Sequence, residues 1–204
     1  MKNTFKIVST LMITIALGSC MGEVGEKLKK AKQGASNATT FAKEAGSMAK
    51  RMNTLKEMAP MSNEDLKSWL PETLDAMERT RFRVGGSGMA KVSSVEGTYK
   101  DKATKKSLNA MVMDGAGEAG SVMAMSFGVF GNMDMEMEDE HKHQQTVEVN
   151  GIQAQQTYFK KNNRTDLMFV YDDRFMVTIK TTDMNPADTW ELVEALNLER
   201  LGEL

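Results

Sequence analysis

Residues that can bind a metal ion gather in one acidic segment of the chain. Residues 133–143 read Met-Asp-Met-Glu-Met-Glu-Asp-Glu-His-Lys-His, with three Met, five carboxylates and two His. Thioethers and imidazoles suit copper or silver, and imidazoles also suit zinc. The candidate metal ligands are Met133, Met135, Met137, His141 and His143.

The backbone conformation decides whether these ligands can converge. Residues two apart on an α-helix point about 200° away from each other, so the three Met can share an ion only if the segment is extended. The alternative is that Met133 and Met137 fill a hydrophobic core while the acidic residues stay solvated. Carboxylates at the C-terminal end of a helix are also unfavourable, which indicates either a special role or a helix that ends earlier.

The only Cys, Cys20, follows a short apolar segment. Lys2 and Lys6 precede the eleven uncharged, mostly apolar residues Ile7–Leu17, too few to span a bilayer and typical of a signal peptide. The sequence Leu17-Gly18-Ser19-Cys20 resembles the lipobox of bacterial lipoproteins. The resemblance implies cleavage before Cys20 and acyl chains such as palmitate on the mature N-terminus, which attach the protein stably to a membrane. The alternative is an ordinary signal peptide with a coincidental Cys.

The residue after Cys20 bears on the location. In lipoproteins of diderm bacteria an Asp at this position favours retention in the inner membrane, and this chain has Met21. The resemblance therefore implies an exported protein anchored to the outer membrane of a diderm host, or to the cell membrane otherwise. No apolar segment reaches eighteen residues, so we expect an anchored and not a spanning protein.

Composition argues against several classes of function. One Cys among 204 residues excludes an intramolecular disulfide framework, and two neighbouring His leave few places for a catalytic triad. Residues 60–204 carry sixteen Lys or Arg against twenty-four Asp or Glu, which argues against a nucleic-acid partner. Gly85-Gly86-Ser87-Gly88 lacks the following Lys of a phosphate-binding loop. We expect no enzyme activity and no resident cofactor, with copper or zinc as the alternative.

Residues 20–59 have the pattern of a helical spacer. Residues 21–59 hold eight Lys or Arg against four acidic residues, a charge that anionic headgroups would attract. Apolar or small residues recur at alternating steps of four and three, and Met48 and Leu55 belong to a second stripe. The pattern predicts a helix that self-associates or folds back on the domain, with a disordered tether as the alternative. The first stripe comprises Val24, Leu28, Ala31, Ala35, Ala38, Ala42, Ala45, Ala49 and Met52.

Residues 60–204 predict an α+β domain. Short helices are expected over 64–70 and 72–78, a long one over 119–137, and a last one after Asp183 or Asn185. The order of strands and helices predicts a mostly antiparallel sheet of about six strands covered by helices. Asn150-Gly151 is the strongest hairpin signal. The expected strands are Val92–Lys100, Ser107–Met113, Thr146–Val149, Ile152–Phe159, Thr165–Tyr171 and Arg174–Thr181.

The expected helix 119–137 has a broad apolar face. We expect Val122 and Ser126 on the side that packs, with Met123 and Phe127 widening it. Such a soft, Met-rich surface either covers the sheet or lines a groove for a lipid or hydrophobic peptide.

The sequence therefore predicts three parts: a signal peptide (1–19), a lipidated Cys with a basic spacer (20–59) and an acidic α+β domain (60–204). We expect a lipid-anchored cell-envelope protein that presents a binding domain to an envelope partner, or to itself through the spacer. The alternatives are a metal-binding protein using residues 133–143 and a carrier of a lipid or other apolar ligand.

Overall fold

The structure is a computed structural model that describes residues 46–85, 92–131 and 134–204, with no side-chain detail for residues 129 and 130. The chain divides into two compact units, Met1–Gly46 and Ser47–Leu204. Cys20, Met133 and the expected spacer up to residue 45 lie outside the described residues. No helix in the described ranges is long and apolar enough to cross a membrane.

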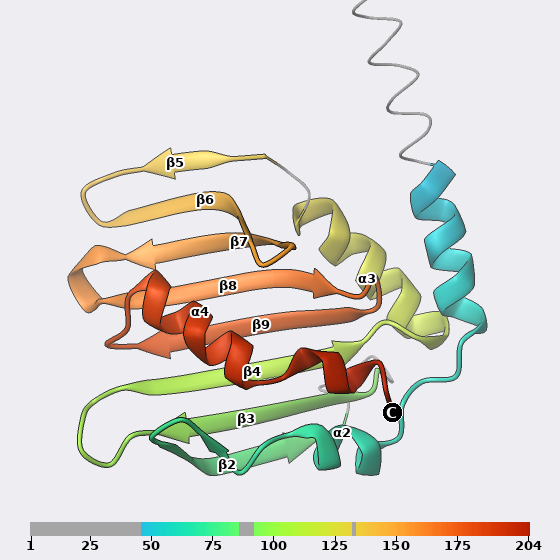
Figure 1. Ribbon diagram of the computed structural model, residues 1–204. Helices are drawn as coiled ribbons and strands as arrows, with labels where there is room; N and C mark the ends of the chain where they lie inside the picture. The colour runs from blue at the N-terminus through green and yellow to red at the C-terminus, as the bar shows by residue number, and fades with distance from the viewer. Residues whose placement is uncertain (1–45, 86–91, 132–133) are drawn as a thin grey trace, which may run out of the picture. The chain divides into compact units, whose positions relative to one another are not determined.

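The second unit is built on one antiparallel sheet of nine strands, in the order β1-β2-β3-β4-β9-β8-β7-β6-β5 (Figure 1). Two meanders meet in its centre, where β4 pairs with β9. The strands are β1 (Thr73–Leu74), β2 (Met77–Val84), β3 (Ser94–Lys100), β4 (Ser107–Asp114), β5 (Glu136–Glu138), β6 (Lys142–Val149), β7 (Ile152–Phe159), β8 (Arg164–Tyr171) and β9 (Phe175–Thr182).

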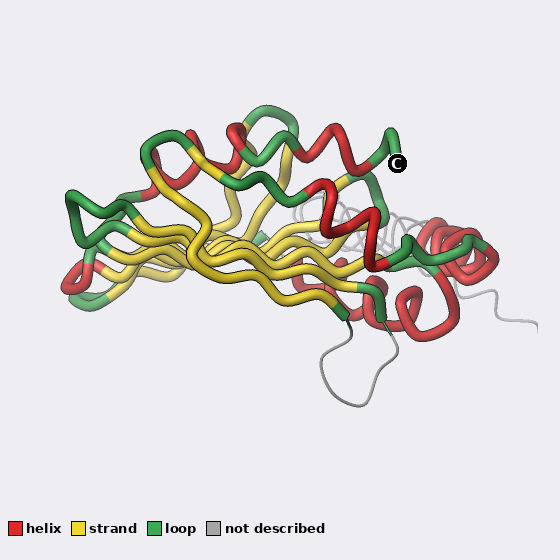
Figure 2. Tube along the Cα trace, turned by 90° about the horizontal axis from the view of Figure 1, so that it is seen from below, coloured by secondary structure: helices red, strands yellow, loops and turns green. Residues whose placement is uncertain are grey.

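Helices lie on both faces of this sheet, so the strands form the middle layer (Figure 2). The first face, which bears Ala110 and Val177, is covered by α2 (Asn63–Trp69), α4 (Pro186–Ala195) and the 3-10 turn η2 (Leu198–Leu201). The second face, which bears Met113 and Met176, packs against α3 (Gly117–Gly131) and a helix over residues 46–57. A second 3-10 turn, η1 (Lys160–Asn162), joins β7 to β8.

The two faces hold cores of different size. Strand alternation in β4 sends Leu108, Ala110 and Val112 into the first-face core, where Trp69 and Phe169 are also fully buried. The second-face cluster is smaller, and its buried members are Leu55, Val92, Met113, Ala124 and Met176. Most of the buried apolar surface that stabilises the fold therefore lies under α2 and α4.

The α+β class and the antiparallel sheet are confirmed, but the expected number of about six strands is wrong. The three further strands are β1 and β5, which are short and end the sheet, and β2, which lies next to β1. The helical turn expected over residues 72–78 is also wrong. Leu74 and Met77 are both buried and pair across a tight turn in which Asp75 has a φ of 49°, so this segment is a hairpin.

The hairpin predicted at Asn150-Gly151 forms, and a second tight hairpin turns at residues 172 and 173. Asn150 and Gly151 both have positive φ, 51° and 75°, and join β6 to β7. Asp172 and Asp173, with φ of 49° and 54°, join β8 to β9 without any Gly. Positive φ at both central residues gives the turn the twist of the flanking strands, which explains both tight connections.

Candidate functional site

The helix expected over 119–137 ends at Gly131, six residues early, and β5 follows at Glu136. The acidic residues thus lie in β5, just before it and in the turn after it, which removes the unfavourable contact with a helix C-terminus. The packing side of the helix differs in part from the expectation, since Met123 and Phe127 do pack against the second-face cluster. Ser121 and Ala124 are buried, whereas Val122 is 54% exposed and Ser126 points to solvent.

The extended segment separates the predicted metal ligands between the two faces of the sheet. Met137 pairs with Gln144, and its neighbour Glu138 pairs with His143. Because paired residues share a face and neighbours alternate, Met137 and His143 point to opposite sides. His141 lies in the turn between β5 and β6, where it is exposed and its Nε2 is 3.1 Å from Oε1 of Glu140. Met135 immediately precedes β5, in the segment that pairs with Thr146.

One imidazole and two carboxylates do share the first face at this edge. His143 Nε2 lies 3.3 Å from Glu136 Oε1. Glu138 instead accepts a 2.7 Å hydrogen bond from Lys160, which lowers the pKa of that carboxyl. Within the described ranges, no group of three or more His, Cys, Asp or Glu could hold a metal ion. Metal binding at 133–143 therefore stays a prediction, and the structure adds one imidazole–carboxylate pair to it.

A buried ion pair, which the sequence did not reveal, fixes one end of the sheet. Asp114, the last residue of β4, is fully buried and accepts hydrogen bonds from Arg174 at 2.7 and 2.8 Å. The backbone N–H groups of Met61 and Ala116 donate to the same carboxylate at 2.7 and 2.9 Å. Burial alone would raise the pKa of Asp114, but these four hydrogen bonds hold it below its ordinary value. The ion pair connects the segment before α2 to the β8–β9 turn, so its role is structural.

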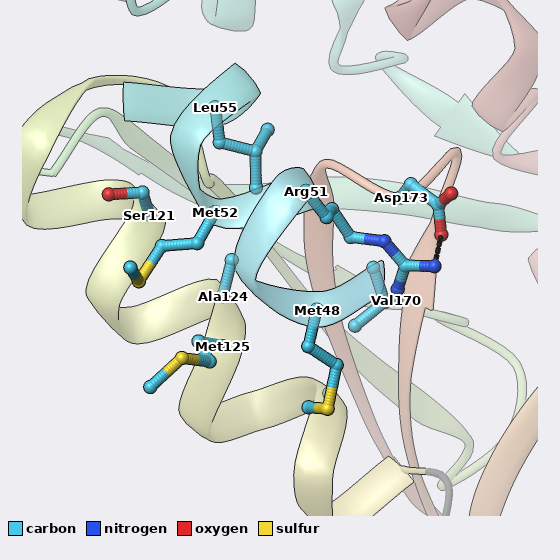
Figure 3. A pocket seen from close by; sticks show the side chains of 10 residues that line it. Met48, Arg51, Met52, Leu55, Ser121, Ala124, Met125, Val170 and Asp173 are labelled. Atoms are coloured by element: carbon cyan, nitrogen blue, oxygen red, sulfur yellow. Dashed lines mark ion pairs between the residues drawn. The ribbon is translucent and has the colours of Figure 1, made fainter. Parts of the chain in front are cut away.

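Hollows surround the β8–β9 turn on several sides. A cleft of about 500 Å³ lies between helix 46–57, the turn residues Asp172 and Asp173, and Gly202. Beside it, Met48 and Met52 of helix 46–57 face Met125 of α3 across a small pocket, closed by an Arg51–Asp173 ion pair of 3.0 Å (Figure 3). This Met-lined pocket has only about 20 Å³ of space, so it resembles helix packing more than a ligand site.

A further hollow at this end is a groove between the β6–β7 turn and α4, called here the Trp190 groove. Its volume is about 400 Å³, which lies within the range of small-molecule sites. Two carboxylates stand at its rim, Glu194, which accepts a hydrogen bond from Asn150, and Glu199. The apolar walls are Val149, Ile152, Tyr171, Trp190, Val193 and Leu198.

The electrostatics of the Trp190 groove favour a positive or neutral occupant. Burial raises the pKa of the Tyr171 hydroxyl, and the negative charges of Glu199 and Asp172 raise it further. Trp190 Nε1 donates a 3.0 Å hydrogen bond to Gln156 Oε1, and its ring stacks on that of Phe169 with 5.9 Å between the ring centroids. These two contacts fix the position of the Trp190 side chain. The groove is thus a rigid aromatic and aliphatic surface with an acidic rim. The sequence did not reveal this groove, because it depends on the β6–β7 turn reaching α4.

Comparison with known proteins gives no relative from which a role could be transferred. No protein-family model, no curated protein and no solved structure matches this chain.

Proposed function

We propose that this chain is a lipid-anchored cell-envelope protein whose α+β domain works by binding. The observation that carries the proposal is the position of Cys20, the only Cys among 204 residues, at the end of a lipobox-like segment. Acylation would hold the domain at the membrane surface, in the outer membrane if the host is diderm. In the described domain, Arg51 pairs with Asp173 and Arg174 pairs with Asp114 at the hollowed end, so these four charged groups hold the fold together, which supports binding over catalysis.

Replacing Cys20 tests the anchor directly. We expect Cys20→Ala to lose incorporation of labelled palmitate and to move from the membrane to the soluble fraction of the exported protein, because no acyl chain remains. Ser19→Ala, which leaves the thiol in place, is the matched control and should stay with the membrane. A Cys20→Ala chain that still fractionates with membranes as the wild type does would contradict the anchor.

A second candidate function, carriage of an apolar ligand, is favoured by the Trp190 groove. Its volume suits a short aliphatic chain, and the carboxylates of Glu194 and Glu199 would attract a cationic head and repel an anionic one. The ligand class that fits is therefore an amphiphile with a positive or uncharged polar group.

Two amphiphiles with the same chain length and opposite charge test whether the groove binds such a ligand. We expect the Cys20→Ala chain to bind dodecyltrimethylammonium about tenfold more tightly than dodecanoate at low salt, followed through Trp fluorescence below the micellar concentration. Ile152→Ser should weaken binding of the cation about fivefold by removing an apolar wall, whereas Val122→Ser, on the exposed side of α3, should not. Equal, Ile152-independent binding of both amphiphiles would exclude the groove as the site.

A further inference from the structure

The sheet ends in two edge strands of opposite charge. At one edge, β1 pairs only with Met77 and Glu78 of β2, so the five residues Thr80–Val84 form an open strand edge in the described part of the chain. This stretch reads Thr-Arg-Phe-Arg-Val, with Phe82 45% exposed. Arg81 and Arg83 are also exposed, and Arg83 pairs from the inner side with Glu96 of β3 at 2.6 Å. Lys67 of α2 lies over the Phe82 ring at 5.2 Å, which brings a further positive charge to this edge.

The opposite edge is acidic. Strand β5 is the last in the sheet and spans only Glu136–Glu138, with all three residues exposed. Residues 134–140 hold five carboxylates and no basic residue. Lys160 neutralises part of this charge from the inner side through Glu138, and His143 Nε2 lies 3.3 Å from Glu136 Oε1, while these two carboxylates remain more than half exposed. The acidic strand is short enough to fit along the open stretch of β2.

The strand directions allow these edges to join as a regular antiparallel pair. Seven antiparallel pairings lead from β2 to β5 across the sheet, and an odd number of reversals makes the two edge strands run in opposite directions. A second copy placed in the same orientation beside the first therefore presents its β5 antiparallel to β2. The same placement keeps the first and second faces of both sheets on the same sides.

We propose that copies of this chain associate head to tail, with β5 of one copy extending the sheet of the next along β2. Unpaired N–H and C=O groups of the two edges would hydrogen-bond, and opposite charge would select this pairing. Pairing of β2 with β2, or of β5 with β5, brings like charges together and is disfavoured. The contact is heterologous, so it propagates into a row or closes into a ring.

Side chains on the first face give the contact its specificity. Phe82 lies on this face, opposite Gly97 of β3 and next to α2, and Glu136 and Glu138 lie on it with His143. In the joined sheet the two carboxylates reach the cation of Lys67 beside the Phe82 ring. On the second face Arg81 and Arg83 lie alongside Met137, which is 44% exposed in the single chain. The proposal does not depend on the lipid anchor, although a membrane would raise the local concentration of copies.

Disulfide trapping in the full chain tests the geometry. Register can change only in steps of two residues without turning the strand over, so Glu136 or Glu138 lies next to Phe82. Exported chains with Phe82→Cys plus Glu138→Cys, or Phe82→Cys plus Glu136→Cys, should give a ladder of dimers, trimers and larger species on mild oxidation. Each single Cys variant should give no ladder. A monomer from both double variants overturns the proposal, as does a dimer from Phe82→Cys alone, which would show a symmetric β2 contact.

A charge exchange tests the specificity in chains that carry one trapping Cys each. One chain carries Phe82→Cys with or without Lys67→Glu, and the other carries Glu138→Cys with or without Glu136→Lys, all in a Cys20→Ala background. We expect either reversal alone to lower the yield of the mixed disulfide about threefold to tenfold, and both together to restore it within about twofold. Lys105→Glu, an exposed reversal in the β3–β4 loop, is the matched control and should change nothing. Equal yields in all four mixtures would contradict charge-selected pairing, and membrane fractionation, scored separately, reports only on the anchor.

Discussion

Asp114 is a carboxylate that the fold keeps charged without access to solvent. Two hydrogen bonds from Arg174 and two from backbone N–H groups satisfy its oxygens. The sequence showed only an Asp-Gly pair after an apolar strand, which predicts a turn. Its partner Arg174 is 60 residues away, and a contact of that separation follows from the pairing of β4 with β9, which local pattern does not determine.

We expect Asp114→Asn to lower the free energy of unfolding by about 3 kcal/mol at pH 7, because it leaves the Arg174 cation half-buried without its counter-charge. The pKa of Asp114 is lowered in the folded chain, so its stabilisation is present above the unfolded value of about 3.9 and is lost as the pH falls through the folded pKa. Urea unfolding between pH 7 and pH 3 should therefore show that the difference in free energy of unfolding between wild type and variant becomes smaller at acid pH. Asp75→Asn, at an exposed turn position, should behave as wild type, and a constant gap would contradict this role for the Asp114 charge.

The elements could be predicted where a pattern repeats locally. The strands with alternating burial, the Asn150-Gly151 turn and the capped last helix all follow from residues close together in the sequence. Strands β1 and β5 have two and three residues, too few for a period to show. The end of α3 at Gly131 and the exposure of Val122 depend on how the helix meets the sheet. Gly120 shows how closely α3 approaches the end of β4, since a Cβ at this position would lie 2.7 Å from the backbone of Gly115.

The candidate sites were less predictable than the elements. The Met and His of residues 135–143 are in one segment of sequence, but alternation along β5 and β6 sends Met137 and His143 to opposite faces. The Trp190 groove needs the β6–β7 turn and α4 to meet, although they are more than 30 residues apart. The charged edges need the strand order of the whole sheet. The groove and the charged edges are set by long-range pairing, and the separation of Met137 from His143 by the register of the β5–β6 hairpin, so residue types alone could not locate them.

At the scale of the whole domain, the unequal cores predict unequal stability of the two faces. The central strands are shared, but the second face is held by a small cluster in which Leu55 is the only fully buried residue contributed by helix 46–57. Local opening of a weakly held element costs less than global unfolding. Helix 46–57 should therefore detach while the sheet and its first-face core remain folded.

Leu55→Ala tests this difference between the faces. We expect it to lower the free energy of unfolding by about 2 kcal/mol. Because the lost packing belongs to the smaller, second-face cluster, amide hydrogen exchange should become faster in residues 46–57 while β4 and β9 stay protected. Leu66→Ala, the same truncation at a fully buried position of α2, removes packing from the first-face core and should lower protection across the whole sheet. If Leu55→Ala instead accelerates exchange in β4 and β9 as much as in residues 46–57, the two faces unfold as one unit and the segment before α2 is an integral part of the core.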